Sequence, residues 1–98
     1  MIIVTGTVLA RVDRLEEALS LSLEHVRRSR TEPGCLSHAV SRDAEDPLHL
    51  TFLEEWVDRD ALTAHFAVPA SRSFARAMTA LASETPTVRI FDADPVSL

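Results

Sequence analysis

The chain has 98 residues and a formal charge of −5 at pH 7, and all ten of its positive side chains are arginines. So short a chain has room for one hydrophobic core, so we predict a single domain over residues 1–98. The negative charge argues against nucleic acid or an anionic membrane as partner. No apolar run is long enough for a membrane helix and no basic leader begins the chain, so we expect a cytoplasmic protein.

The first third of the chain predicts a strand followed by a helix. Residues 2–12 are rich in β-branched side chains and apolar at nearly every position, which indicates a strand buried on both faces. Asp13 and Glu16 have the spacing of a helix cap, and apolar residues then recur at helical intervals. The pattern predicts a helix over 14–31 that a Pro-Gly pair ends.

The rest of the chain predicts three more strands and two helical segments. Strands are expected over 35–42, 48–57 and 87–91, the first two forming a hairpin with a loop of four or five residues. Asp58 can cap a short helix that Pro69 breaks, and a second helical segment follows over 70–83.

This order of elements indicates an α+β fold. It matches the ferredoxin-like βαββαβ arrangement, in which a four-stranded antiparallel sheet carries its helices on one face. The helices cannot cover both faces, yet the strands over 2–12 and 48–57 are apolar on both sides. We therefore predict a homodimer in which a second copy covers the open face.

The four histidines do not show a metal-binding spacing. They are separated by 13, 11 and 16 residues, so none has the i,i+2 or i,i+4 spacing of a strand or helix chelate. His38 and His49 share the predicted hairpin, but neither loop length brings their rings together. With only two glycines the chain lacks a glycine-rich phosphate loop. We expect neither a metal nor a flavin cofactor.

A group of aromatic and polar side chains is the candidate site. The two-residue period of a strand places Leu50, Phe52, Glu54 and Trp56 on one face. Later helical residues can fold over this row, and they are His65, Phe66, Phe74 and Met78. Two interpretations remain open here, an aromatic core around Trp56 and an apolar cavity for a small molecule.

Several motifs occur in a familiar order along the chain. They are Glu32-Pro33-Gly34-Cys35-Leu36, Arg42-Asp43-Ala44-Glu45-Asp46-Pro47, Phe52-Leu53-Glu54-Glu55-Trp56, Ala61-Leu62-Thr63-Ala64-His65-Phe66 and Phe74. From Met1 to about Phe91 the pattern resembles the antibiotic biosynthesis monooxygenase family of the dimeric α+β barrel superfamily. The resemblance implies a pocket bordered by Trp56 and His65.

The resemblance also implies that the protein is a cofactor-independent monooxygenase, which oxidises a small aromatic quinol or phenol with dioxygen. An electron-rich phenolate can itself pass an electron to dioxygen, so no cofactor is required. We expect His65 to act as the base and Trp56 to donate its indole N–H to a substrate oxygen. Arg72 or Arg76 could hold the anion. The expected substrate-binding residues are Phe52, Glu54, Phe66, Phe74, Met78 and Arg76.

Two other functions fit the same residues. One is a non-catalytic dimeric module that binds a small aromatic molecule, and it would not accelerate dioxygen consumption. The other is an isomerase or degradative enzyme of a signalling molecule, and it would act without dioxygen.

Overall fold

The computed structural model covers residues 1–98 and contains one four-stranded sheet, three α-helices and a short 3₁₀ helix. The elements in chain order are β1 (Ile2–Leu9), η1 (Val12–Arg14), α1 (Leu15–Ser29), β2 (Cys35–Arg42), β3 (His49–Trp56), α2 (Arg59–Ala67), α3 (Pro69–Leu81) and β4 (Thr87–Asp92). None of the helices has both the length and the apolar character needed to cross a membrane.

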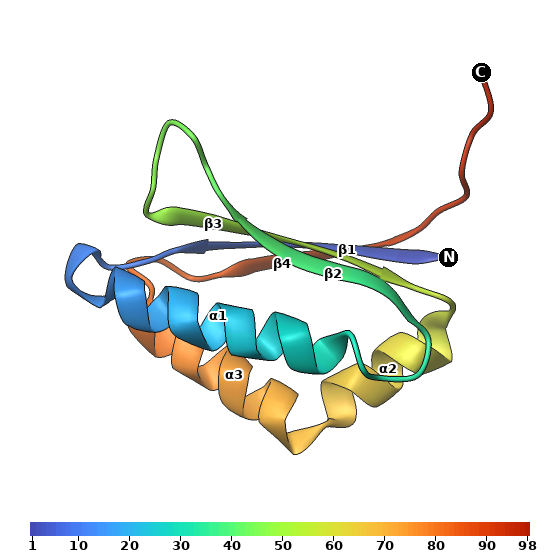
Figure 1. The fold of residues 1–98 in the computed structure, drawn as a ribbon, viewed down its shortest axis with the longest axis horizontal. Helices are drawn as coiled ribbons and strands as arrows, with labels where there is room; N and C mark the ends of the chain where they lie inside the picture. The colour runs from blue at the N-terminus through green and yellow to red at the C-terminus, as the bar shows by residue number, and fades with distance from the viewer.

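The sheet is antiparallel throughout, in the order β2-β3-β1-β4. All three helices lie against one face of it, and the opposite face carries no helix (Figure 1). This confirms the ferredoxin-like α+β arrangement predicted from the order of elements.

The prediction that the first strand is buried on both faces is wrong for the isolated chain. Burial alternates along β1, so that Ile2, Val4, Gly6 and Val8 are buried beneath the helices and the alternate residues are only partly buried. The reason is that one layer of helices covers a single face of the sheet. The open face would need a second layer to become buried.

The helix starts differ in how they are capped. The predicted cap at Asp13 is wrong, because Asp13 lies within η1 and α1 begins after Arg14 with no side-chain cap. A residue in a 3₁₀ turn lacks the extended backbone that an N-cap uses. The cap at Asp58 is confirmed, since its carboxylate accepts the N–H of Ala61 at 2.9 Å. Pro69 is the first residue of α3, where its missing N–H costs nothing.

The predicted register of the β2–β3 hairpin is also wrong. Arg42 pairs with Leu50, so the connection is longer than five residues. Side chains inside the loop stabilise it, as Asp43 and Asp46 each accept a backbone N–H two residues further on. The longer connection sets His38 opposite Glu54 of the inner β3 row, and a bulge between Cys35 and Ser37 shifts the pairing only at the start of β2.

The apolar core lies between the helices and the inner face of the sheet, in two separate clusters. One, which includes Val8, Leu50 and Phe52, lies under α1 and α3. The other packs Trp56 with residues from β1 and α2. Glu54 stands between Phe52 and Trp56 on the same buried face of β3. A polar layer therefore separates the two clusters.

We predict that Gly34→Ala destabilises the fold by roughly 2 kcal/mol or more. Gly34 has a φ of +82°, and a Cβ there would lie 2.5 Å from the Cβ of Ala61. Gly6→Ala is the control, since its Cβ would meet only atoms 3.4 Å or more away. Urea unfolding of both variants measures the difference, and equal stabilities would contradict the prediction.

Candidate functional site

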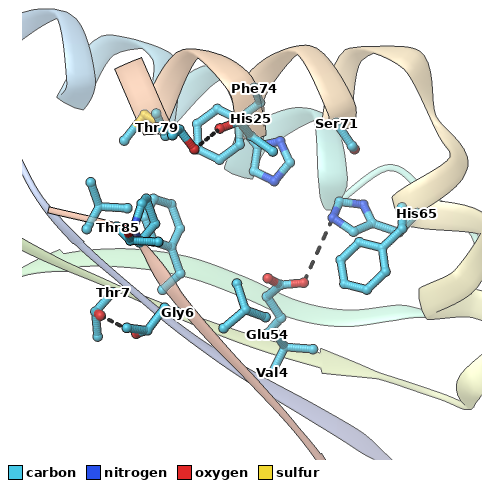
Figure 2. A pocket seen from close by; sticks show the side chains of 18 residues that line it. Val4, Gly6, Thr7, His25, Glu54, His65, Ser71, Phe74, Thr79 and Thr85 are labelled. Atoms are coloured by element: carbon cyan, nitrogen blue, oxygen red, sulfur yellow. Dashed lines mark hydrogen bonds and ion pairs between the residues drawn. The ribbon is translucent and has the colours of Figure 1, made fainter. Parts of the chain in front are cut away.

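A cavity of about 300 Å³ lies between α3 and the inner face of the sheet. Its walls come from β1, β3, β4, α1, α2 and α3, and most of the surface is apolar (Figure 2). The structure brings together six of the residues predicted for the site, which are Phe52, Glu54, His65, Phe66, Phe74 and Met78. A space of this size fits a small aromatic molecule.

His65 is paired with a carboxylate that sequence reasoning did not find. Its Nδ1 lies 2.7 Å from Oε1 of Glu32, and both side chains are largely buried. A carboxylate can only accept here, so Nδ1–H donates and Nε2 keeps its lone pair. Glu32 belongs to the turn before β2, and no local spacing relates it to α2. The pair holds the ring of His65 in one tautomer and one orientation.

Glu54 is a buried carboxylate that lies beside the indole of Trp56 and two imidazoles. Its Oε1 accepts the indole N–H of Trp56 at 2.9 Å and lies 3.4 Å from Nε2 of His38 and 3.9 Å from Nε2 of His65. Burial by itself raises the pKa of this carboxyl, but His38, Trp56 and His65 outweigh it, so the pKa of Glu54 falls below its ordinary value. The cavity therefore carries a fixed negative charge.

Two predicted site residues do not reach the cavity. Trp56 is fully buried behind it, and its single N–H is used by Glu54. Trp56 stacks at a tilt against His65, with 4.6 Å between ring centroids, so it supports the site instead of contacting a ligand. Arg76 lies on the exposed side of α3, where it donates to Ser73. A long charged side chain keeps its guanidinium in water, so Arg76 stays on the solvent side of the helix and does not line the apolar cavity.

His25, which is not among the residues predicted for the site, enters it from α1. Its ring stacks on Phe74 with centroids 3.9 Å apart and planes 5° from parallel. Arg28 lies 2.7 Å from Nδ1, and because a guanidinium can only donate, Nδ1 accepts. The pKa of His25 is lowered to about 3. Burial is the largest cause, and the charges of the neighbouring histidines and of Arg28 add to it.

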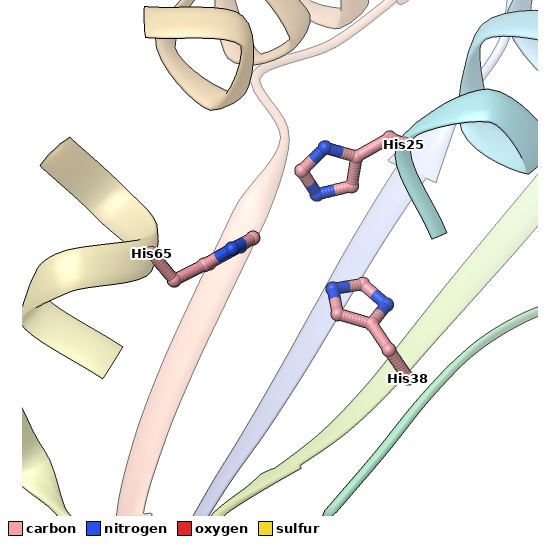
Figure 3. A group of neighbouring side chains, drawn as sticks. All are labelled: His25, His38 and His65. Atoms are coloured by element: carbon pink, nitrogen blue, oxygen red, sulfur yellow. The ribbon is translucent and has the colours of Figure 1, made fainter. Parts of the chain in front are cut away.

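His38 completes a group of three buried histidines. One ring nitrogen from each of His25, His38 and His65 lies within 4.8 Å of the others. Their rings converge on one point from α1, β2 and α2 (Figure 3). Spacing along the chain could not reveal the group, because each histidine comes from a different element and the hairpin register decides where His38 points.

Most of the chain matches a known protein family in sequence. The model of the family described as "Antibiotic biosynthesis monooxygenase" matches residues 1–77. The chain belongs to the antibiotic biosynthesis monooxygenase family. An uncharacterised protein of Synechocystis is 31% identical over 90 residues, which are 92% of this chain and 61% of that protein. The chain therefore spans about three fifths of the length of this curated relative.

Solved structures show the same architecture. A crystal structure described as an antibiotic biosynthesis monooxygenase is 33% identical, with a TM-score of 0.89 over 97% of this chain and all of the other. A candidate antibiotic biosynthesis monooxygenase from Deinococcus radiodurans is 25% identical, with a TM-score of 0.93 over all of this chain and 97% of the other. A Mycobacterium tuberculosis protein, at 22% identity and TM-score 0.89 over 98% of both chains, shares the fold.

We predict that His25 makes the protein less stable in mild acid. The folded protein keeps His25 neutral down to about pH 3, whereas the unfolded chain binds a proton near pH 6.5. The unfolded state therefore binds more protons between these values, and the free energy of unfolding falls as the pH is lowered through that window. The slope from this residue is up to about 1.4 kcal/mol per pH unit.

Urea unfolding between pH 7.5 and 4.5, in a metal chelator, measures this slope. His25→Gln should flatten it. His49→Gln is the matched control, since His49 is a partly exposed histidine at the start of β3 and should keep the wild-type slope. Equal slopes in all three proteins would show that His25 does not carry the effect.

Proposed function

We propose that the protein is a monooxygenase that oxidises a small aromatic quinol or phenol with dioxygen, without a cofactor, using His65 as the base. The observation that carries the proposal is the 2.7 Å contact between Glu32 and His65 at the wall of an apolar cavity. Membership of the antibiotic biosynthesis monooxygenase family supports the reaction class.

The first step is removal of a phenolic proton. Nε2 of His65 holds the free lone pair, because Nδ1–H is donated to Glu32. The resulting imidazolium is stabilised by the Glu32 carboxylate, as in other carboxylate–histidine pairs. The product of the step is an electron-rich phenolate inside the cavity.

The phenolate then reduces dioxygen by one electron. Superoxide and the aryloxyl radical combine at a ring carbon that bears hydrogen, forming a C–O bond, and the proton from His65 gives a hydroperoxide. Loss of that carbon's hydrogen together with hydroxide leaves a quinone and water. One dioxygen is consumed for each phenol, one oxygen atom enters the product and the other leaves as water.

The walls of the cavity suit this chemistry. Phe74 and Phe52 present rings whose centroids are 5.9 Å apart, and Met78 adds a polarizable side chain beside them. Such a lining favours a flat aromatic ligand. Oε1 of Glu54 lies 3.9 Å from Nε2 of His65, so its negative charge attracts the imidazolium formed in the first step.

We predict that His65→Ala lowers the rate of dioxygen consumption by about 10²–10⁴-fold, the loss typical of a general base. An oxygen electrode with a panel of soluble hydroquinones and naphthols gives the rate. Glu32→Gln should lower kcat more than it changes KM, because Glu32 lies behind the imidazole and away from the ligand. His49→Ala is the control and should keep wild-type turnover.

Thermal unfolding of the same variants separates catalysis from folding. Unchanged turnover in a well-folded His65→Ala protein would overturn the assignment of the base. A wild-type protein that binds these phenols without consuming dioxygen would instead be a binding module. Conversion of a ligand under anaerobic conditions would indicate an isomerase or a degradative enzyme.

We further propose that the protein acts as a homodimer joined through the open face of its sheet. Leu53 on β3 and Phe91 on β4 lie on that face, and they are 49% and 37% exposed although both are large apolar side chains. Only 21 of the 98 residues are buried in the isolated chain. A second copy would cover the exposed side chains and enlarge the apolar core.

We predict a light-scattering mass of about twice 10.8 kDa at micromolar concentration. Leu53→Arg should shift the protein toward monomer, because it places a charge in the proposed contact. Val12→Arg is the control, since Val12 is 79% exposed but lies in η1, outside the sheet. A monomeric wild-type protein would rule out the dimer.

A further inference from the structure

We propose that His25, His38 and His65 form a binding site for one divalent transition metal ion, with Glu54 beside it as a fourth ligand. Three imidazoles from α1, β2 and α2 converge on one point, and one carboxylate oxygen borders that point (Figure 3). This inference does not depend on the proposed oxidation. It replaces the expectation of no metal, which rested on local spacing alone.

The distances are close to those of a coordination sphere. Three atoms that all lie within 4.8 Å of one another have a common point no more than about 2.8 Å from each. Zinc–imidazole bonds are about 2.0–2.1 Å long, so each ring has to move inward by less than about 1 Å. Small rotations of the side chains provide such a movement without any shift of the backbone.

His38 is the observation that most directly indicates a ligand. Its side chain is completely buried, neither ring nitrogen makes a hydrogen bond, and Nε2 has a contact of 3.4 Å with Oε1 of Glu54. A buried imidazole without hydrogen bonds is costly, so a group of this kind calls for an explanation. A metal ion bound to one of its nitrogens supplies the missing interaction.

The two other rings are already held in place. His65 donates Nδ1–H to Glu32, which leaves Nε2 free and orients the ring, as the outer carboxylates of metal sites do. Phe74 stacks face to face on His25 and fixes the plane of its ring. Both histidines line the cavity, so an ion can enter through it.

The local charge also favours a cation. Glu32 and Glu54 bring two carboxylates into the site, Arg28 contacts the ring of His25, and Arg30 donates to the backbone carbonyl of His38. The side chains that contact the three imidazoles, which are Glu32, Glu54 and Arg28, together carry one excess negative charge. Three imidazoles and one carboxylate suit zinc, and they also suit its neighbours cobalt, nickel and copper.

Arg28 opposes metal binding at His25. It donates to Nδ1, which places the ring proton on Nε2, the nitrogen left to face the other two histidines. Binding through Nε2 moves the proton to Nδ1 and separates the arginine from the ring. Arg28 already lies 3.4 Å from the hydroxyl of Ser71, which can accept it instead. Removal of the guanidinium should therefore strengthen metal binding.

Metal binding and base catalysis at His65 exclude one another. Both use the lone pair on Nε2, so a bound ion prevents His65 from accepting a proton. The metal site is therefore tested by binding measurements without substrate, and the oxidation is tested in the presence of a chelator. Failure of one proposal can then be distinguished from failure of the other.

The experiment titrates chelator-treated protein with Zn²⁺ by calorimetry and with Co²⁺ by visible absorption. The wild-type protein should bind one ion per chain, and Co²⁺ should show the ligand-field bands of a site with nitrogen ligands. His38→Ala should lose stoichiometric binding. Glu32→Gln should weaken binding about 10–100-fold, the usual effect of removing an outer partner. Arg28→Gln should strengthen it several-fold.

His49→Ala is the matched histidine control and should bind like the wild type, since the ring of His49 lies beside Asp43 at the hairpin and is not part of the cluster. If His38→Ala does not fold, Arg28→Gln and Glu32→Gln still test the site through opposite changes in affinity. The proposal is overturned if the wild-type protein binds neither ion stoichiometrically. It is also overturned if binding is the same in Glu32→Gln, Arg28→Gln and the wild type.

Discussion

The rest of the site depends on one buried carboxylate, that of Glu54, on the face of the sheet that otherwise forms the apolar core. An ionised group in this position is costly unless hydrogen-bond donors surround it. Trp56 provides the donor, and the Nε2 atoms of His38 and His65 lie 3.4 and 3.9 Å from the same carboxylate oxygen. These groups form a polar layer between two apolar clusters. The cavity lies at the edge of this layer, so it has an apolar wall on one side and titratable groups on the other.

His65 is the residue on which both proposed roles converge. The carboxylate of Glu32 fixes its tautomer, and this leaves a single lone pair facing the cavity. A proton and a metal ion are alternative ligands of that lone pair. Arg28 acts on the opposite histidine and favours the tautomer that does not bind metal. The same cluster can therefore serve acid–base chemistry when free of metal and lose it when an ion binds.

The single layer of helices explains the shape of the molecule around this site. It covers one face of the sheet, and along β4 its cover is incomplete. Val88 and Phe66 remain largely exposed where they line the cavity, at 62% and 44%. The cavity is open on this side, which allows a ligand to enter. The uncovered opposite face is the surface on which the proposed dimer would form.

The sequence by itself determined the elements and the inner row of β3, because a strand alternates its faces every two residues and Phe52, Glu54 and Trp56 obey that period. It also indicated the family, through motifs that lie close together in the chain. It could not determine the Glu32–His65 pair or the histidine cluster, since their members are far apart in the chain. The longer loop of the hairpin set His38 opposite Glu54, and helix packing brought His25 and His65 to meet it. Only the tertiary structure decided these contacts, because long-range packing and strand register leave no local pattern in the sequence.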